Sequence, residues 1–550
     1  MINISTLLFT LLFVSACTTN TPVKHWEPYD ETAEIEANQT HENPRMRYKL
    51  IQSKLLDKNE LWAPFEKALK RFGEEGYLKL KPLVLEQDIP SLQQHIASGA
   101  LTYEKLTLFY LYRIRKFESD PNTTLHAVLA LNPNIIQEAK QKDREKQDDN
   151  HPIFGMPILL KDNINTSDMP TTAGAALLQH HIPENNAFVV DQLKAKGALI
   201  LGKVNLSEWA YYFCAGCPLG YSAVGGQTLN PYGRKIFETG GSSSGSGVAV
   251  AANYAVAAVG SETSGSILSP SSKNAVVGLK PTIGLVSRTG IVPISGTLDT
   301  SGPMTKNVVD NAILLEAMTG KDLSDPVTTN APVSNPSYSQ ASQNTRFQGV
   351  RLGAIKSFVA TDSLYGEAVK TLRESGAEVI EYDPPSISFN GFLSLLNGDM
   401  KHDLPVYFDT YAGEDYIGYD VQSVMDYNQQ DSLLRMPYGQ ARLEGVVADT
   451  ITKKGLKTLI EQLNQSASSF YKDPMEAYQL DAILSINNYY AAYAAAAFYP
   501  CLTVPMGYSE SGEPANLTFV APCFQEERLY ELAAAYESIT KHRKLPKGYE

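Results

Sequence analysis

The residue types that could do chemistry are concentrated in one stretch, from residue 240 to residue 282. It opens with Gly-Gly-Ser-Ser-Ser-Gly-Ser-Gly at 240–247. After an uncharged run rich in alanine and valine, it continues with Ser-Glu-Thr-Ser-Gly-Ser-Ile at 261–267. A serine hydroxyl can attack a carbonyl carbon, and glycines let backbone N–H groups point at the oxyanion that forms. The composition therefore indicates nucleophilic catalysis by a serine.

The chain between the two serine clusters is predicted to run out and return. Residues 246–254 contain no proline and several alanines, which favours a short helix that travels roughly 15 Å. Residues 255–259 are apolar and end at Gly260, which is typical of a buried strand that returns about 16 Å. Ser242 and Ser266, which are 24 residues apart, can therefore end as neighbours.

A lysine at the end of an apolar segment is the third chemical feature. Residues 153–160 are mostly apolar, and Lys161 follows them directly. A buried lysine has a lowered pKa, so it can be neutral and act as the base that a weakly acidic hydroxyl requires. The alternative is a surface lysine whose aliphatic stem lies along apolar side chains.

Together these motifs resemble the signature of the amidase signature family, serine hydrolases that cleave amides with a Ser–Ser–Lys triad. The matches are Gly-Met-Pro-Ile-Leu-Leu-Lys-Asp-Asn at 155–163, the two serine clusters, and Gly-Leu-Lys-Pro-Thr at 278–282. Further matches are Gly-Gly-Gln-Thr at 225–228, Asn-Pro-Tyr at 230–232 and Asp-Thr-Ser-Gly-Pro-Met at 299–304. The resemblance extends from about Asp88 to Arg543, and the form of residues 242–246 is similar to the branch that includes bacterial peptide amidases.

The resemblance implies a role for each residue of the candidate site. Ser266 would be the nucleophile that carries the acyl group, Ser242 would be a bridging serine held by a cis peptide bond, and Lys161 would be the base. The oxyanion hole would consist of the N–H groups of Thr263, Ser264, Gly265 and Ser266. Such an enzyme would need no metal and no cofactor, and would release ammonia or an amine from a small amide or a peptide amide.

Three positions depart from the pattern of the resembled family. Ser264 precedes Gly265 where the family often has two glycines, Glu262 stands where it often has Asp, and Leu268 stands where it often has Arg. Ser264 adds a Cβ at the predicted oxyanion hole. The loss of Arg at position 268 should remove an ion pair near the site without changing the chemistry.

The composition places the chain among globular proteins with a large core. Its 550 residues are 43% hydrophobic and 19% charged, and the formal net charge of −13 argues against nucleic acid as a partner. Strands that alternate with helices predict an α/β fold with a mixed, mostly parallel twisted sheet covered by helices on both faces. We expect one amidase signature domain over residues 81–550, with the substrate shaped by a variable region at about 386–475.

The N-terminal residues are predicted to be a targeting segment. Residues 7–13 are apolar but too short to span a bilayer, and Val-Ser-Ala-Cys at 14–17 resembles a bacterial lipobox. Cleavage would leave lipid on Cys17, and Thr18 resembles sorting to the outer membrane, so a periplasmic lipoprotein is expected. An ordinary secretory signal is the alternative. Residues 18–80 are expected to form a tether and surface helices, and only the lipid would contact the membrane.

The cysteines allow more than one interpretation. Cys214 and Cys217 form a Cys-x-x-Cys motif that a redox pair or half a zinc site could also use. The chain offers no second pair of cysteines or histidines at metal-binding spacing, so a structural or disulfide-linked pair is preferred. Cys501 and Cys523 could also form a disulfide in an oxidising compartment.

Other functions are compatible with parts of the sequence. Gly-Ser-Ser-Ser-Gly at 241–245 matches the nucleophile elbow of α/β-hydrolases, which would make Ser243 the nucleophile with His402 or His542 as base. The charged residues 234–238, however, are not typical of the buried strand that such an elbow follows. The chain also resembles the glutaminase-type subunit of tRNA amidotransferases, which export disfavours, and it could be a non-catalytic binding protein on this fold. The sequence specifies neither the oligomeric state nor the substrate, which could be an alkyl, aryl, peptide or cell-wall-derived amide.

Overall fold

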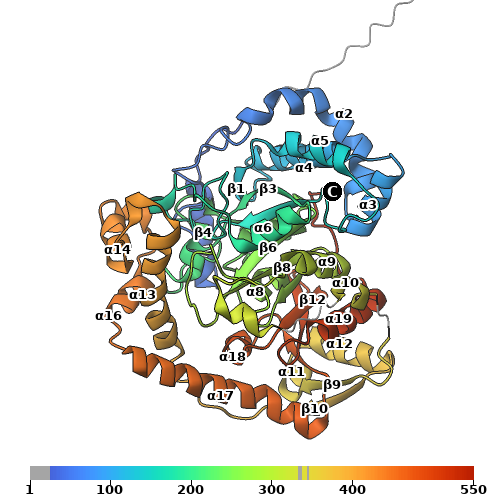
Figure 1. The fold of residues 1–550 in the computed structure, drawn as a ribbon, viewed down its shortest axis with the longest axis vertical. Coiled ribbons are helices and arrows are strands. Elements are labelled where there is room, and N and C mark those ends of the chain that lie inside the picture. The colour runs from blue at the N-terminus through green and yellow to red at the C-terminus, as the bar shows by residue number, and fades with distance from the viewer. Residues whose placement is uncertain (1–24, 332–336, 344–345) are drawn as a thin grey trace, which may run out of the picture.

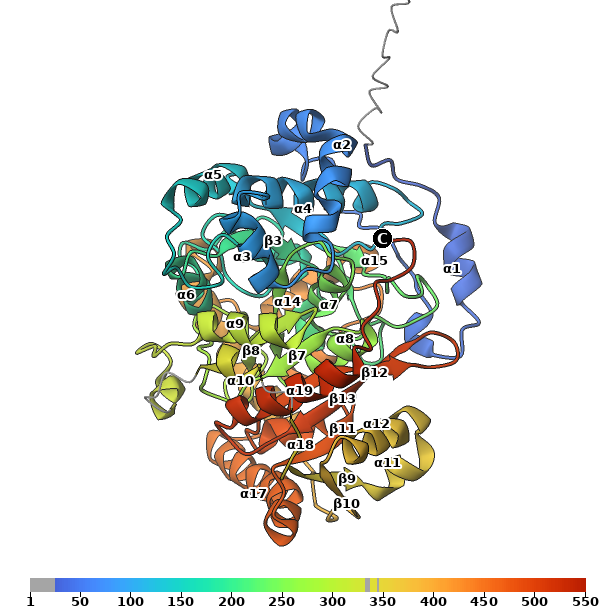
Figure 2. The same cartoon turned by 90° about the vertical axis from the view of Figure 1, so that its right-hand side faces the viewer.

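A mixed sheet of 11 strands forms the centre of the molecule. A computed structural model describes residues 25–331, 337–343 and 346–550, so the predicted targeting segment 1–17 with Cys17 lies outside the described residues (Figures 1 and 2). In spatial order the strands are β1 (Val128–Leu131), β3 (Leu199–Val204), β2 (Pro157–Lys161), β6 (Ala257–Glu262), β8 (Thr300–Thr305), β7 (Val277–Lys280), β12 (Cys501–Tyr508), β13 (Pro514–Val520), β11 (Ala482–Ile486), β9 (Arg351–Ile355) and β10 (Glu378–Tyr382). A separate two-stranded sheet pairs β4 (Tyr221–Ser222) with β5 (Gly226–Gln227).

The strand directions confirm the predicted α/β class and the mixed sheet, with one difference in detail. The pairs β3–β2, β2–β6, β11–β9 and β9–β10 are parallel. The other six neighbouring pairs are antiparallel. Antiparallel pairs therefore outnumber parallel pairs, whereas we expected a mostly parallel sheet. The connection from β12 to β13 shows the reason: it is a short turn, and a direct turn joins antiparallel strands whereas parallel strands need a crossover.

Helices flank the sheet in the described residues (Figures 1 and 2). Those before β9 are α1 (Thr32–Asn38), α2 (Glu66–Val84), α3 (Ile89–Ala97), α4 (Tyr103–Glu118), α5 (Ile135–Glu145), α6 (Phe188–Ala195), α7 (Ser244–Ala251), α8 (Leu268–Lys273), α9 (Val308–Met318) and α10 (Tyr338–Ala341). Those after it are α11 (Lys356–Thr361), α12 (Ser363–Glu374), α13 (Phe392–Tyr411), α14 (Val421–Gln429), α15 (Ser432–Arg435), α16 (Ala441–Ala448), α17 (Lys453–Tyr478), α18 (Ala491–Ala496) and α19 (Glu526–Thr540). None of these helices is long and apolar enough to cross a membrane.

The strands and helix that carry the serine and lysine motifs are fully buried. Every residue of β2 is buried because β3 and β6 pair with its two edges and helices cover the sheet. Every residue of α7 is buried too, which matches its small and apolar composition. The predicted helix at 246–254 and strand at 255–259 are confirmed as α7 and β6, with bounds shifted by two or three residues.

The variable region forms a helical layer with its own apolar core. Helices α13, α14, α16 and α17 lie together along the left and lower edges of Figure 1. Their apolar side chains pack on loops near the serine clusters, and the buried cluster includes Trp209, Val292, Ile294, Leu395, Met400, Leu443 and Phe470. Two carboxylates of α13 also hold the loop after residue 294: Asp399 accepts a hydrogen bond from Ser295 Oγ, and Asp403 accepts one from Gly296 N at 2.6 Å. The region therefore supports the loops that border the site.

The segment before α2 packs onto the body from its first described residues. Trp26 is buried, its ring lies under Lys58 Nζ at 4.3 Å, and it makes an edge contact with the His126 ring. Lys58 Nζ in turn forms a buried ion pair of 2.9 Å with Glu118 at the end of α4. The same carboxylate accepts hydrogen bonds from Thr124 Oγ1 and from the backbone N–H groups of residues 125–127. One carboxylate thus joins the N-terminal segment to the sheet.

We expect Glu118→Ala to lower the free energy of unfolding by about 3 kcal/mol, because it leaves the buried Lys58 ammonium without its counter-charge and several buried N–H groups without an acceptor. Chemical denaturation measures this change. Glu74→Ala is the matched control, since Glu74 pairs with Lys116 at 2.8 Å on the surface and should contribute less than about 1 kcal/mol. Equal effects of the two substitutions would contradict the structural role of Glu118.

Candidate active site

The side chain of Lys161 is fully buried and touches both serine clusters. Its Nζ lies 2.7 Å from Ser242 Oγ, 2.8 Å from Ser261 Oγ and 3.1 Å from the Ser261 carbonyl oxygen. Asn163 Nδ2 donates to Ser261 Oγ at 3.0 Å and so fixes that hydroxyl. Burial lowers the pKa of Lys161 from 10.5 to about 7, although the negative charges of Asp299 and Glu262 oppose the shift.

The neighbouring carboxylate does not pair with this lysine. Asp162 forms a buried ion pair with Lys203 at 3.1 Å, and its other oxygen accepts hydrogen bonds from the backbone and hydroxyl of Thr172. Among the described residues, Lys161 takes part in no ion pair. With no carboxylate in contact, the low pKa that burial gives to the amine is preserved.

Ser242 and the second serine cluster meet at the start of α7. The peptide bond between Gly241 and Ser242 is cis, and Ser242 is fully buried. Ser243 N donates to the Ser266 carbonyl at 3.1 Å, so the predicted approach of the two clusters is confirmed. Ser266 itself is half-buried, which leaves it accessible from outside while Ser242 and Lys161 are enclosed.

The turn at 263–266 presents backbone N–H groups beside Ser266. Gly265 adopts φ +104°, a conformation that residues with a side chain rarely adopt. Within the described ranges, no acceptor is bonded to the N–H groups of Thr263, Ser264 or Ser266. Glu262 holds the far side of the turn by accepting from Ile267 N at 2.6 Å and Leu268 N at 3.0 Å. The turn can therefore direct donors at a developing negative charge.

Glu262 is held by backbone groups and not by a cation. Burial raises the pKa of its carboxyl, and in the part of the chain that the structure describes it forms no ion pair. Leu268, where the resembled family often has Arg, is buried near it and supplies only its N–H. The expected loss of an ion pair at this position agrees with these contacts.

A cavity of about 180 Å³ lies beside the lysine and its partners. Apolar residues 291–294 form one part of its wall. Polar residues form another part, among them Asn163, Ser261, Thr263, Arg288, Asp299 and Tyr411. The carboxylate of Asp299 joins the two walls, because it accepts from Thr263 Oγ1 and from the N–H groups of Ile294 and Ser295 at 2.8 and 2.9 Å. The cavity is large enough for part of a small organic substrate.

The nucleophile-elbow interpretation of Ser243 is wrong. Ser243 Oγ is buried, donates to the Ser261 carbonyl at 3.0 Å and accepts from Ser261 N at 3.2 Å. His402 lies exposed on α13, and the ring of His542 contacts Tyr536, so neither histidine is a partner of Ser243. Ser243 is a structural residue that fastens α7 to the end of β6.

The comparisons with known proteins agree with this geometry. Residues 105–396 match the family model described as Amidase. The chain belongs to the amidase family. A probable amidase of Arabidopsis thaliana is 35% identical over 483 residues, which cover 84% of this chain and 92% of the relative. A glutamyl-tRNA(Gln) amidotransferase component from Caldanaerobacter subterraneus is 30% identical, with 84% and 98% covered.

Two solved amidase structures share the fold over most of the chain. An amidase family protein from Bacillus anthracis superposes with a TM-score of 0.86 at 36% identity, covering 90% of this chain and 99% of that chain. The peptide amidase from Stenotrophomonas maltophilia gives a TM-score of 0.78 at 36% identity, covering 84% and 98%. The protein is therefore an enzyme that hydrolyses amides. Its predicted resemblance to the branch of the family that includes bacterial peptide amidases is confirmed.

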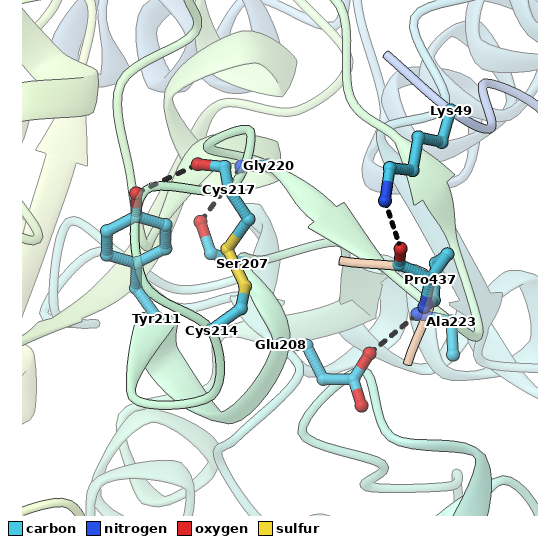
Figure 3. Close-up of a disulfide and its surroundings, with 9 residues drawn as sticks. All are labelled: Lys49, Ser207, Glu208, Tyr211, Cys214, Cys217, Gly220, Ala223 and Pro437. Carbon is cyan, nitrogen blue, oxygen red and sulfur yellow. Dashed lines mark hydrogen bonds between the residues drawn. A yellow bond between two sulfur atoms is a disulfide. The ribbon is translucent and has the colours of Figure 1, made fainter. Parts of the chain in front are cut away.

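A disulfide in this amidase lies in a segment that hydrogen bonds connect to Ser242. Cys214 and Cys217 are bonded, and Tyr211 OH donates to the Cys217 carbonyl at 2.8 Å (Figure 3). The chain then turns so that Gly220 N donates to Ser207 Oγ at 2.8 Å, as Figure 3 also shows. Ser207 N donates in turn to the Ser242 carbonyl at 3.0 Å. The preferred interpretation of this cysteine pair is confirmed.

The second cysteine pair does not form. Cys501 and Cys523 are free, with their Sγ atoms directed at the carbonyl oxygens of Tyr499 and Phe498. Other contacts of the amidase site were not predicted either. Ser261 and Asn163 both lie inside the quoted motifs, but the spacing alone gives no sign that they meet the lysine amine.

Proposed function

We propose that this amidase cleaves its substrate through an acyl-enzyme on Ser266, with Ser242 as the proton relay and Lys161 as the base. The products are a carboxylic acid and ammonia or an amine, released from a small amide or a peptide amide. The observation that carries the proposal is the 2.7 Å contact between the buried Lys161 amine and Ser242 Oγ, beside the turn of Ser266.

The hydrogen-bond partners of the amine are compatible with a neutral lysine. A neutral amine has two N–H groups and one lone pair. The two oxygens of Ser261 can accept the two N–H groups, at 2.8 and 3.1 Å. The lone pair is then left for the hydroxyl proton of Ser242, which is the direction that a base requires. A pKa of about 7 makes this form abundant at neutral pH.

The proposed reaction moves one proton in and out of the site. Ser266 Oγ attacks the amide carbon as its proton passes to Ser242 and the proton of Ser242 passes to Lys161. The C–N bond then breaks, and the leaving nitrogen takes up the proton through Ser242. Water next attacks the ester on Ser266 by the same relay and releases the acid. The chain supplies every proton acceptor that these steps need.

The oxyanion of each tetrahedral intermediate is assigned to the turn at 263–266. Its N–H groups come from Thr263, Ser264, Gly265 and Ser266, and the hydrogen bonds that Glu262 and Asp299 accept keep the turn in place. Fixed backbone donors need no reorganisation during the reaction. Loss of one such donor typically costs about 3 kcal/mol of transition-state stabilisation.

Two other functions lead to different outcomes in simple assays. Similarity to a peptide amidase of known structure supports a peptide amide as the substrate, and similarity to amidotransferase subunits would instead favour free glutamine. A non-catalytic protein on the amidase fold would hydrolyse neither and would not react with a fluorophosphonate. We expect hydrolysis of amidated dipeptides and labelling of Ser266.

We expect Ser266→Ala, Ser242→Ala and Lys161→Met each to lower kcat/KM for an amidated dipeptide by at least about 10³-fold, because each removes one member of the relay. Release of ammonia measures the rate. Ser243→Ala is the matched control, since this adjacent serine only fastens α7 to β6 and its loss should leave most activity. Substantial turnover by Ser266→Ala would overturn the assignment.

We expect kcat/KM to rise with pH through an inflection near 7 and to level off above it, because Lys161 must lose its proton and its pKa is lowered to about 7. Rates measured from acidic to mildly alkaline pH test this. Asp299→Asn removes a negative charge that raises the pKa of Lys161, so the inflection should move to lower pH. A flat profile, or one that falls with rising pH, would contradict a neutral lysine base.

We also propose that the enzyme is exported and anchored by lipid on Cys17 at the periplasmic side of the outer membrane. The disulfide between Cys214 and Cys217 supports an oxidising compartment. In bacterial cells we expect the wild-type protein in the membrane fraction. We expect the Cys17→Ser variant either in the soluble fraction or as the uncleaved precursor. Wild-type protein that stays in the cytoplasmic fraction would refute the proposal.

A further inference from the structure

A segment after β11 lies directly against the turn that carries Ser266. A methyl group built at Gly265 would be 3.0 Å from Asn488 Nδ2 and 3.5 Å from Ala491 Cβ. Asn488 therefore reaches the residue next to the proposed nucleophile, and α18 begins at the same point. The segment therefore borders the turn that carries Ser266.

The side-chain amide of Asn488 has no hydrogen-bond partner among the residues that the structure describes. The residue is half-buried. A primary amide offers both donors and an acceptor, which are the groups that a peptide bond needs. A polar side chain held beside a catalytic turn without a partner is suited to bind a polar group of the substrate.

Aromatic side chains cluster around the residues that follow Asn488 in the chain. We call them the aromatic shelf: Phe358, Phe389, Phe392, Tyr489, Tyr490 and Tyr493. Their rings touch in sequence, with centroids 5.9 Å apart between Phe358 and Tyr490, 5.4 Å between Tyr490 and Tyr493, and 4.5 Å between Tyr493 and Phe389. Buried Phe470 supports the two central tyrosines from below at 4.9 and 5.0 Å.

The shelf is partly open to solvent although its members come from three separate parts of the chain. Tyr489 is 56% exposed, and the other five residues are half-buried. Figures 1 and 2 place α11, which carries Phe358, and α18, which carries Tyr493, near the same end of the sheet. Accessible aromatic rings that adjoin a catalytic turn are typical of a ligand-binding surface.

We propose that Asn488 and the aromatic shelf bind the residue whose amide is cleaved, and that the enzyme prefers amides of N-acylated amino acids with aromatic side chains. The substrate ring packs on Tyr490 and Tyr493, and Asn488 binds the peptide group on the other side of the α-carbon. This inference rests on the proposed function, because it takes Ser266 as the nucleophile. It adds the chemical class of the substrate, which the serine motifs do not specify.

The test compares two amides that differ only in the side chain, N-acetylphenylalanine amide and N-acetylalanine amide. We expect the wild-type enzyme to favour the phenylalanine amide by about tenfold or more in kcat/KM, a ratio typical of one well-filled apolar site. Tyr493→Ala should lower this ratio at least about fivefold and change kcat for the alanine amide less than about twofold. Tyr493→Phe, which keeps the ring, should retain the ratio.

Asn488→Ala tests the polar half of the site. It should raise KM for both N-acetylated amides and leave 3-phenylpropanamide, which lacks the acetamido group, unchanged. Tyr478→Ala is the matched control for Tyr493→Ala, because Tyr478 is an exposed tyrosine outside the shelf, at the end of α17. It should behave like the wild type in every assay.

The outcomes separate this inference from the proposed function. Wild-type rates that do not differ between the two acetylated amides, or an equal loss for both in Tyr493→Ala, would overturn the inference while Ser266→Ala stays inactive. Persistent turnover by Ser266→Ala would instead refute the mechanism itself. A preference that Tyr493→Ala abolishes and Tyr493→Phe retains would establish the aromatic shelf as the specificity site.

Discussion

The exclusion of water from one amine is the constraint on which the rest of the site depends. Lys161 ends a central strand of a sheet that helices cover, and its side chain is fully buried. Burial alone would favour pairing with the adjacent Asp162, which would restore the charge. Lys203 on β3 takes that carboxylate instead. The parallel pairing of β2 and β3 thus supports the chemistry as well as the fold, because it brings the second lysine to the same strand end.

Three consecutive serines at the start of α7 have three different tasks. Ser242 contacts the amine, Ser243 fastens the helix to β6, and Ser244 Oγ donates back to the Gly240 carbonyl at 2.6 Å. Only the first contacts Lys161, although the three are chemically identical. The cis peptide bond before Ser242 and the hydrogen bond from Ser207 to its carbonyl distinguish it from its neighbours. Position within the fold therefore decides which hydroxyl can exchange a proton.

The sequence allows the catalytic centre to be predicted better than its surroundings. Lys161, Ser242 and Ser266 stand in motifs with fixed spacing, and the short helix and strand between the serines have clear local signals. Membership of the motifs does not reveal the importance of Ser261 and Asn163, and Asn488 lies outside them. Ser261 and Asn163 form their contacts of about 3 Å, and Asn488 lies against Gly265, only in the folded chain. The same holds for the sheet. Periodicity predicts single strands, but it does not specify that β12 lies between β7 and β13.

That position of β12 has a consequence for how the chain acquires its structure. The neighbouring strands β1, β3, β2, β6, β8 and β7 are complete by residue 305. The free edge of β7 receives its partner only from residues 501–503 of β12, about 200 residues later. Until then the edge exposes unpaired N–H and C=O groups, which can pair with other chains. Long-range pairing of this kind is generally slow, and unpaired strand edges generally favour aggregation. The centre of the sheet closes only when almost the whole polypeptide has been synthesised.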